Sequence, residues 1–366
     1  MAKQDAHVEK VLLLAPQMEA RGTSEYIVNL AAELIRLGVQ AAVFCVPGPS
    51  VQILLREGVP IRTFDRLDGL KFRLHRKRLL EAVQDFGPQL VHAQSCRAAA
   101  ALGLLSKSMD IPLVLTVHGV PRRAGAVRRV ARRVDGLVVT THSAREALVN
   151  RCKVDRQKIE VIHNGIDMDR LAEGEILPIF RSQSHVVGSV GPIERHRGHE
   201  LFIKAVRLLV QKGVEGQFVV AGIGHALPQL RRTIDELDLG GRLTLVTDFT
   251  AYEQVLDALD IVVQSSLVDV SGFSILEAMG RGRPVIAFNT GTACEIIKDS
   301  HTGLVVPKGD VDELAAAIER LITDTELARR MGREARRRVK EKFSIHTIAS
   351  RTLQFYGGVL TRRISG

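Results

Sequence analysis

Short apolar runs alternate along the whole chain with longer amphipathic segments, and this alternation restricts the possible folds more than any other feature. The runs are rich in Val and Ile and are flanked by Gly and Pro, which is typical of strands buried on both faces of a parallel sheet. The expected strands are 11–14, 41–46, 61–64, 90–92, 113–117, 137–140, 159–163, 186–190, 218–221, 243–246, 261–264, 285–288 and 304–306.

The segments between the runs have the 3.6-residue periodicity of helices that bury one face. Strands that alternate with such helices through right-handed crossovers form a doubly wound α/β sheet. The clearest expected helices are 26–37, 201–212, 252–259, 314–322, 324–342 and 345–360.

The alternation stops once and then restarts. Residues 168–184 contain no convincing strand and include Gly174 and Pro178, so the interdomain linker is predicted there. We therefore expect two Rossmann-like domains, 1–175 and 176–345, and a C-terminal helix, 346–366, that packs back on the first domain. Ligands bind at the carboxyl ends of parallel strands, so the site is predicted in a cleft where those ends of the two sheets meet.

Composition narrows the class of protein. No apolar run approaches the roughly 20 residues of a membrane-spanning helix, and the polar start of the chain lacks the apolar core of a signal peptide; a cytoplasmic location is predicted. The cysteines have no metal-ligand spacing, so we expect reduced, mostly buried thiols and no metal site. They are Cys45, Cys96, Cys152 and Cys294.

The net charge of +10 is unevenly distributed. Residues 1–175 hold 26 Lys and Arg against 19 Asp and Glu, which accounts for 7 of the 10 excess positive charges. Such an excess predicts an anionic partner, either phospholipid, an anionic acceptor or nucleic acid. Aromatic residues make up only 4% of the chain and Trp is absent, which disfavours the base stacking of a nucleic-acid-binding protein.

The segment 264–284, QSSLVDVSGFSILEAMGRGRP, carries the richest chemistry. A turn at Ser271, Gly272 and Phe273 leads into a helix, where free N–H groups and the helix dipole favour an anion such as a phosphate. The carboxylates of Asp269 and Glu277 suit the hydroxyls of a sugar or ribose. Spacing alone leaves equally open that both acids are solvated or cap helices.

This segment resembles the signature P-S-x-x-E-G-F-G-x-x-x-x-E-A-M-A-x-G-x-P-V of glycosyltransferase family 4, retaining enzymes of the GT-B fold. The matching residues are Ser266, Gly272, Glu277, Ala278, Met279, Gly282, Pro284 and Val285. Further stretches resemble family landmarks in the same order, so the resemblance spans nearly the whole chain. They are TVHG at 116–119, VIHNGID at 161–167, GPIERHRG at 191–198, VVAGIG at 219–224, and HTGLVVP at 301–307 followed by Asp310.

The resemblance implies a nucleotide-sugar donor, bound without a metal, and a role for each matching residue. Glu277 would bind the donor ribose, Asp269 the transferred sugar and Arg197 the diphosphate, while His118 would lie beside the donor sugar. His118 also fits a core histidine, and Gly22 a plain turn glycine. The residues assigned to donor binding are Gly22, Gly191, Arg195, Gly222, Gly272, Phe273 and Ser274.

Several positions depart from the family pattern. Pro192 replaces an Arg that contacts the diphosphate, and Arg195 or His196 is the candidate substitute. Arg197 replaces a Lys, which keeps the charge and adds a fork suited to phosphate. Asp269 is shorter than the usual Glu, and the first loop has Gly22 followed by Thr23. The departures at Pro192 and Asp269 support an alternative, a noncatalytic nucleotide-sugar-binding or scaffold protein.

The first half also contains a strongly basic segment, RRAGAVRRVARR at 122–133. On a helix, the second and third arginine pairs share a broad face, with Val127, Val130 and Val134 nearer the other. A solvated face is one interpretation; docking on an anionic membrane surface, or steering of an anionic acceptor, is the other. Arg122, Arg123, Arg128, Arg129, Arg132 and Arg133 are the candidate contacts.

Overall fold

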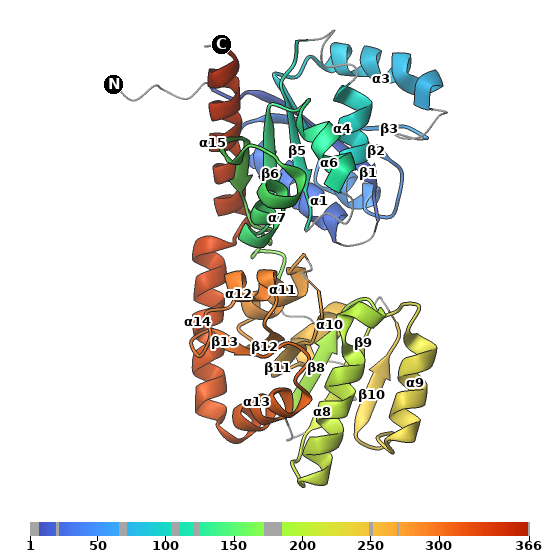
Figure 1. The fold of residues 1–366 in the computed structure, drawn as a ribbon, viewed down its shortest axis with the longest axis vertical. Coiled ribbons are helices and arrows are strands. Elements are labelled where there is room, and N and C mark those ends of the chain that lie inside the picture. Colours follow the sequence, from blue (N-terminus) through green and yellow to red (C-terminus); the bar gives the residue numbers. More distant parts are fainter. Residues whose placement is uncertain are drawn as a thin grey trace. The chain divides into compact units, whose positions relative to one another are not determined.

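The computed structural model describes residues 7–19, 22–65, 72–103, 110–119, 124–171, 185–248, 252–268 and 271–364. The chain forms two compact units, one made of Met1–Asp167 with Ser344–Gly366 and the other of Met168–Phe343 (Figure 1). The predicted boundary at 175–176 falls outside the described residues. The C-terminal segment returns to the first unit two residues before the predicted position.

The N-terminal unit contains a seven-stranded parallel sheet in the order β3-β2-β1-β4-β5-β6-β7. Each expected strand is present within a few residues of its predicted bounds. The strands are β1 (Lys10–Gln17), β2 (Gln40–Val46), β3 (Ile61–Thr63), β4 (Leu90–Ala93), β5 (Leu113–Val117), β6 (Gly136–Val139) and β7 (Ile159–Val161).

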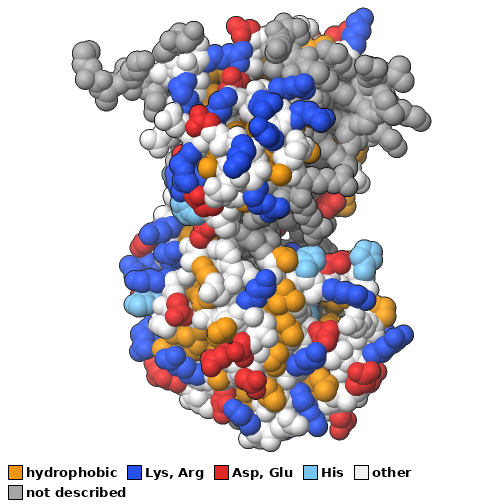
Figure 2. Space-filling view, in the orientation of Figure 1, with side chains coloured by type: hydrophobic (Ala, Val, Ile, Leu, Met, Phe, Trp, Pro, Cys, Tyr) orange, Lys and Arg blue, Asp and Glu red, His pale blue; other side chains and the backbone are white. Residues whose placement is uncertain are grey.

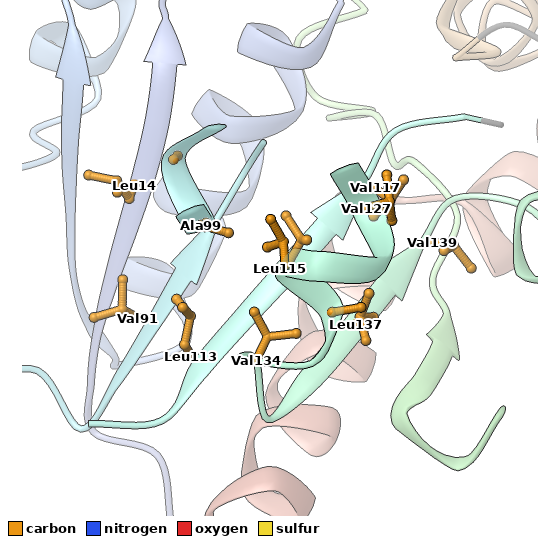
Figure 3. Packing of buried hydrophobic residues seen from close by; sticks show 14 of the residues in the cluster. Leu14, Val91, Ala99, Leu113, Leu115, Val117, Val127, Val134, Leu137 and Val139 are labelled. Atoms are coloured by element: carbon orange, nitrogen blue, oxygen red, sulfur yellow. The ribbon is translucent and has the colours of Figure 1, made fainter. Parts of the chain in front are cut away.

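Helices cover both faces of this sheet. One face packs under α3, α4, α6 and α7, and Val127 of α6 lies over Leu115 and Val117 (Figure 3). The opposite face packs under α1 and α15, which contact each other. The helices are α1 (Thr23–Arg36), α2 (Val51–Arg56), α3 (Phe72–Phe86), α4 (Cys96–Gly103), α6 (Ala124–Ala131), α7 (His142–Cys152) and α15 (Ile345–Ile364), with the 3₁₀ turn η1 (Arg156–Lys158).

The helix α15 is attached to the N-terminal unit along its length. His346 lies 2.9 Å from a carboxylate oxygen of Glu33 on α1, and the guanidinium of Arg351 donates to the carbonyl of Val161 at the end of β7. Deeper in the unit, the hydroxyl of Tyr356 lies 2.6 Å from Nδ1 of His92, a fully buried residue of β4. The last 20 or so residues of the chain therefore complete the core of the first unit.

The second unit repeats the plan with a six-stranded parallel sheet in the order β10-β9-β8-β11-β12-β13. Its strands also agree with the predicted runs, because each is short and mostly apolar and all but the edge strand β10 are largely buried. They are β8 (Val186–Val190), β9 (Gln217–Ala221), β10 (Leu243–Val246), β11 (Ile261–Gln264), β12 (Val285–Phe288) and β13 (Gly303–Val306). The helices are α8 (His199–Gln211), α9 (Leu227–Glu236), α10 (Tyr252–Ala258), α11 (Phe273–Gly280), α12 (Gly291–Ile296), α13 (Val311–Thr323) and α14 (Thr325–Lys342), with the 3₁₀ turn η3 (Arg195–Arg197).

The two sheet orders confirm the predicted pair of doubly wound Rossmann-like domains. In each, the order reverses direction beside the first strand of the unit: at β1 and β4 in the first, and at β8 and β11 in the second. At such a point the loops that follow the two neighbouring strands run to opposite faces of the sheet. A crevice is therefore expected between them at the carboxyl edge. These two crevices are where ligand-binding residues are expected.

Candidate functional site

Two sequence motifs lie side by side at the carboxyl edge of the C-terminal sheet. The loop after β11 is hydrogen-bonded to the loop after β8, because the N–H of Leu267 donates to the carbonyl of His196 at 2.9 Å. The hydroxyl of Ser265 donates to the carbonyl of Gly198 at 2.8 Å. The segment 191–198 and the start of the segment 264–284, which sequence similarity assigns to diphosphate and sugar binding, are therefore bonded to each other.

The loop after β9 is also bonded to the loop after β8. The N–H of Gly191 donates to the carbonyl of Ala221 at 2.9 Å, and that of Ile193 to the carbonyl of Ile223 at 2.8 Å. A Cβ on Gly222 would collide with the carbonyl oxygen of Gly191. Packing between the two loops therefore explains the glycine at position 222, whether or not its backbone also contacts a ligand.

The first turn of α11 offers backbone N–H groups that the helix itself does not bond. Gly272 is its N-cap residue, with a φ of +76° that favours glycine, and Gly272 itself has no side chain to cap the helix. Phe273 is buried and Ser274 is partly exposed at the first two helical positions. The N–H groups of a first turn have no partner within the helix, so this end of α11 can bind an anion such as a diphosphate.

Glu277 lies one turn into α11 and is buried, with only 5% of its surface exposed. The hydroxyl of Tyr252 on α10 donates to its Oε2 at 2.7 Å. The helix α10 is in turn attached to the end of α11 by the ion pair between Asp257 and Arg281, whose Nε lies 2.6 Å from Oδ1. Two helices thus hold the Glu277 carboxylate in one orientation.

Arg197 is the last residue of the turn η3. It interacts electrostatically with Tyr252, the residue that donates to Glu277. Burial lowers the pKa of Arg197, and the electrostatic effects of Tyr252 and Glu194 partly oppose that shift; a guanidinium remains charged in any case. Its Nε is buried and has no hydrogen-bond partner among the described residues, as is also the case for Oγ of Ser266 and Nε2 of Gln264. Buried polar groups are normally paired, so these atoms indicate a polar ligand at this edge.

The remaining residues of the site prediction have different outcomes. Arg195 of η3 is exposed, and Pro192 is also exposed. Asp269 lies outside the described residues, as do Arg122 and Arg123. His118 and Gly22 belong to the N-terminal unit, so the predicted set is divided between the two units.

His118 follows the last residue of β5, at the carboxyl edge of the N-terminal sheet. Its ring meets that of Tyr26 edge-on, with centroids 5.4 Å apart. Burial lowers the pKa of His118 to about 4, so the imidazole is neutral at pH 7. Gly22 is the N-cap of α1, with a φ of +74° and open space where a Cβ would lie, which permits close approach of a ligand to its backbone.

The sequence predictions missed Tyr252, because a hydroxyl that reaches a carboxylate 25 residues away leaves no local pattern. We expect Tyr252→Phe to weaken nucleotide-sugar binding two- to tenfold by loss of the hydrogen bond that orients Glu277. Calorimetric titration of both proteins would measure this. Unchanged affinity, with the melting temperature also unchanged, would remove Tyr252 from the site.

Three features of the described residues bear on the predictions about metals, membranes and thiols. They contain no group of three or more His, Cys, Asp and Glu that could hold a metal ion, and none of their helices is long and apolar enough to cross a bilayer. Cys45 and Cys152 are buried as expected, but Cys294 is exposed and Cys96 partly so. The prediction of mostly buried thiols therefore holds for only two of the four.

Comparison with known proteins agrees with this geometry. Family models match residues 20–170 (Glycosyltransferase Family 4) and 178–338 (Glycosyl transferases group 1). The alpha-D-kanosaminyltransferase of Streptomyces kanamyceticus is 27% identical over 310 residues, 77% of this chain and 79% of the relative. A lipopolysaccharide core biosynthesis mannosyltransferase of Rhizobium leguminosarum bv. viciae is 26% identical over 368 residues, 96% and 98% of the two chains.

Solved structures show the same fold. Anabaena HepE in complex with UDP-glucose superimposes with a TM-score of 0.80 at 20% identity, and the match covers 98% of this chain and 100% of that one. The two Rossmann-like units are those of the GT-B fold, as the sequence resemblance implied. Since the two family models together cover nearly the whole chain, the protein belongs to the family 4 glycosyltransferases.

Proposed function

We propose that this glycosyltransferase moves a sugar from a UDP- or GDP-sugar to an acceptor hydroxyl, with retention of the anomeric configuration. The acceptor oxygen bonds to the anomeric carbon, the bond from that carbon to the diphosphate breaks, and the hydroxyl proton passes to the departing phosphate. Arg197 and the first turn of α11 stabilise the charge on the leaving group. Glu277 binds the ribose, and Asp269 holds the transferred sugar.

One observation supports this proposal most strongly. Tyr252 bonds the buried Glu277 carboxylate and also acts electrostatically on Arg197, whose Nε has no partner among the described residues. A carboxylate suits the paired hydroxyls of a ribose, and a guanidinium fork suits a diphosphate. Such groups placed together match the two ends of a nucleoside diphosphate.

Titration of the purified protein with a panel of UDP- and GDP-sugars, followed by assay of nucleotide release, tests the proposal. Tight binding of one nucleotide-sugar with release of its nucleotide in the presence of acceptor is the expected result. Binding without any release would favour the noncatalytic alternative, which the exposed Pro192 in place of an arginine suggests. Binding of none of the donors would contradict both.

We also propose that the protein works in cell-envelope glycan or glycolipid synthesis and docks reversibly on the inner face of the membrane. Arg128, Arg129, Arg132 and Arg133 are exposed, and no ion pair is found for them within the described part of the chain. Basic side chains gather over the part of the unit where α6 and α7 lie (Figures 1 and 2). The valines of α6 and Val134 are buried in the core, so the contact with lipid would be electrostatic only.

A vesicle experiment tests this docking. We expect the protein to sediment with vesicles of anionic lipid at low salt and not with neutral ones, because each arginine near an anionic surface contributes about 1 kcal/mol and salt screens that attraction. Replacing the four arginines by serine should weaken binding about tenfold or more.

A matched control removes four exposed cations from the other unit, by replacing Arg330, Arg333, Arg336 and Lys340 of α14 with serine. If this control lowers vesicle binding as much as the α6 variant does, net charge alone explains the attraction. Equal binding to neutral and anionic vesicles would contradict electrostatic docking.

A further inference from the structure

Two side chains at the carboxyl edge of the N-terminal sheet carry buried polar atoms that have no hydrogen-bond partner among the described residues. Gln94, the residue after β4, is 1% exposed, and neither its Oε1 nor its Nε2 is bonded. The Nε2 of His118, just after β5, is buried in the same condition. Buried amides are almost always paired, so these atoms call for a polar partner that the described residues do not supply.

Strand alternation carried one residue beyond β4 and β5 puts these two side chains on one face of the sheet. One step earlier on the same strands, Nε2 of His92 lies 2.6 Å from Oγ1 of Thr116. Side chains two residues apart on a strand share a face, so Gln94 continues the column of His92 and His118 that of Thr116. This is the face that α1 and α15 cover.

The polar side chains of this column are hydrogen-bonded inside the unit, whereas at its edge buried polar atoms have no partner among the described residues. His92 is bonded on both ring nitrogens, to Tyr356 and to Thr116. Within the described part of the chain Gln94, in contrast, is bonded through its backbone alone, whose N–H donates to the carbonyl of Leu14 on β1 at 2.9 Å. That bond places Gln94 at the β1–β4 position, where the sheet order reverses and a crevice is expected.

The chemistry of the pair favours a neutral, hydroxyl-bearing ligand. The Gln94 amide offers both donors and an acceptor, and a neutral imidazole offers one further donor or acceptor. Neither group is charged at neutral pH, so neither matches a phosphate. A hydroxyl, which donates one hydrogen bond and accepts others, fits between an amide and an imidazole.

We propose that Gln94 and His118 together bind a ring hydroxyl of a sugar, and that Gln94 determines which sugar is accepted. The inference rests on the proposed glycosyl transfer and adds to it a specificity-determining residue on the N-terminal unit. The sugar is either that of the donor or that of the acceptor.

The variant Gln94→Met separates ligand binding from a structural role. It removes both amide atoms and keeps a side chain of similar length, so the unpaired polar group is lost without a large cavity. We expect a melting temperature equal to or above that of the parent, together with an at least tenfold lower kcat/KM. The matched control is Gln84→Met at an exposed position of α3, which should change neither quantity.

Binding experiments identify the source of the sugar. UDP and GDP are titrated beside the UDP- and GDP-sugars of the donor panel. If Gln94 binds the donor sugar, Gln94→Met loses about tenfold in affinity for the nucleotide-sugar and binds the free nucleotide as the parent does. If it binds the acceptor, donor affinity is unchanged and the KM for the acceptor rises about tenfold.

Two results would overturn the inference. One is a Gln94→Met protein with unchanged donor affinity, acceptor KM and turnover. The other is a loss of turnover accompanied by a lower melting temperature and restored at a temperature where the variant is fully folded, because that is the behaviour of a structural residue. Failure of the parent protein to bind any nucleotide-sugar would instead contradict the proposed function itself.

Discussion

Replacing Arg197 by alanine should lower kcat by about 10²–10³-fold, the loss seen when one pre-positioned donor to a developing negative charge is removed. The side chain is partly buried, its Nε has no partner among the described residues, and its loop is bonded to the loop that leads to α11. We propose that its charge faces the leaving diphosphate, whose charge develops as the bond to the sugar breaks. Steady-state assay of nucleotide release would measure the loss.

Two further variants make this test specific. Arg231→Ala removes an exposed arginine from α9 of the same unit, and it should leave turnover unchanged. Pro192→Arg, which restores the residue of the family pattern, should keep or raise turnover. If Arg197→Ala releases nucleotide at the rate of the parent protein, the leaving group is stabilised by other residues and our assignment is wrong.

Replacing Glu277 by alanine should weaken donor binding by roughly 1.5–3 kcal/mol, about tenfold or more, if the carboxylate makes a charged hydrogen bond to the ribose. Calorimetry with the donor identified from the panel gives the affinity directly. Free nucleotide should lose as much affinity as the nucleotide-sugar, because both carry the ribose. An unchanged affinity for a donor that the parent binds would remove Glu277 from the site.

The bond from Tyr252 complicates that measurement, because Glu277→Ala leaves a buried hydroxyl without this partner. The double variant Tyr252→Phe with Glu277→Ala removes both groups. If the single and double variants bind the donor equally weakly, the loss comes from the missing carboxylate. If the double variant recovers the affinity of Tyr252→Phe alone, the loss came from the change at the Tyr252 hydroxyl.

The fold could be predicted from the sequence because the central strands of a doubly wound sheet are buried on both sides. Such strands are continuous apolar runs, and the runs at 113–117 and 186–190 coincide with β5 and β8. The amphipathic helices were equally visible, and Val127, Val130 and Val134 lie in the core while the neighbouring arginines are exposed. The spacing of apolar residues along a helix or strand shows directly which face is buried. These elements can therefore be predicted from short stretches of sequence.

The sites were less predictable, because their details depend on contacts between distant segments. Sequence similarity singled out Glu277 and Arg197, but neither the Tyr252 hydroxyl nor the unpaired amide of Gln94 has a signature along the chain. Both become visible only when strand register and helix packing are known. The domain boundary shows the same limit, since α15 joins the first unit through contacts with residues more than 180 positions earlier, such as Val161 and Glu33.

That return of the chain has a consequence for the order in which the protein is made. Domains emerging from the ribosome generally fold one after another, the N-terminal one first. Here the first unit lacks α15 until residues 344–366 have been synthesised, and until then His92 has no Tyr356 to bond. The second unit is continuous from Met168 to Phe343 and is complete sooner. The half of the protein that is synthesised first is therefore the half that finishes folding last.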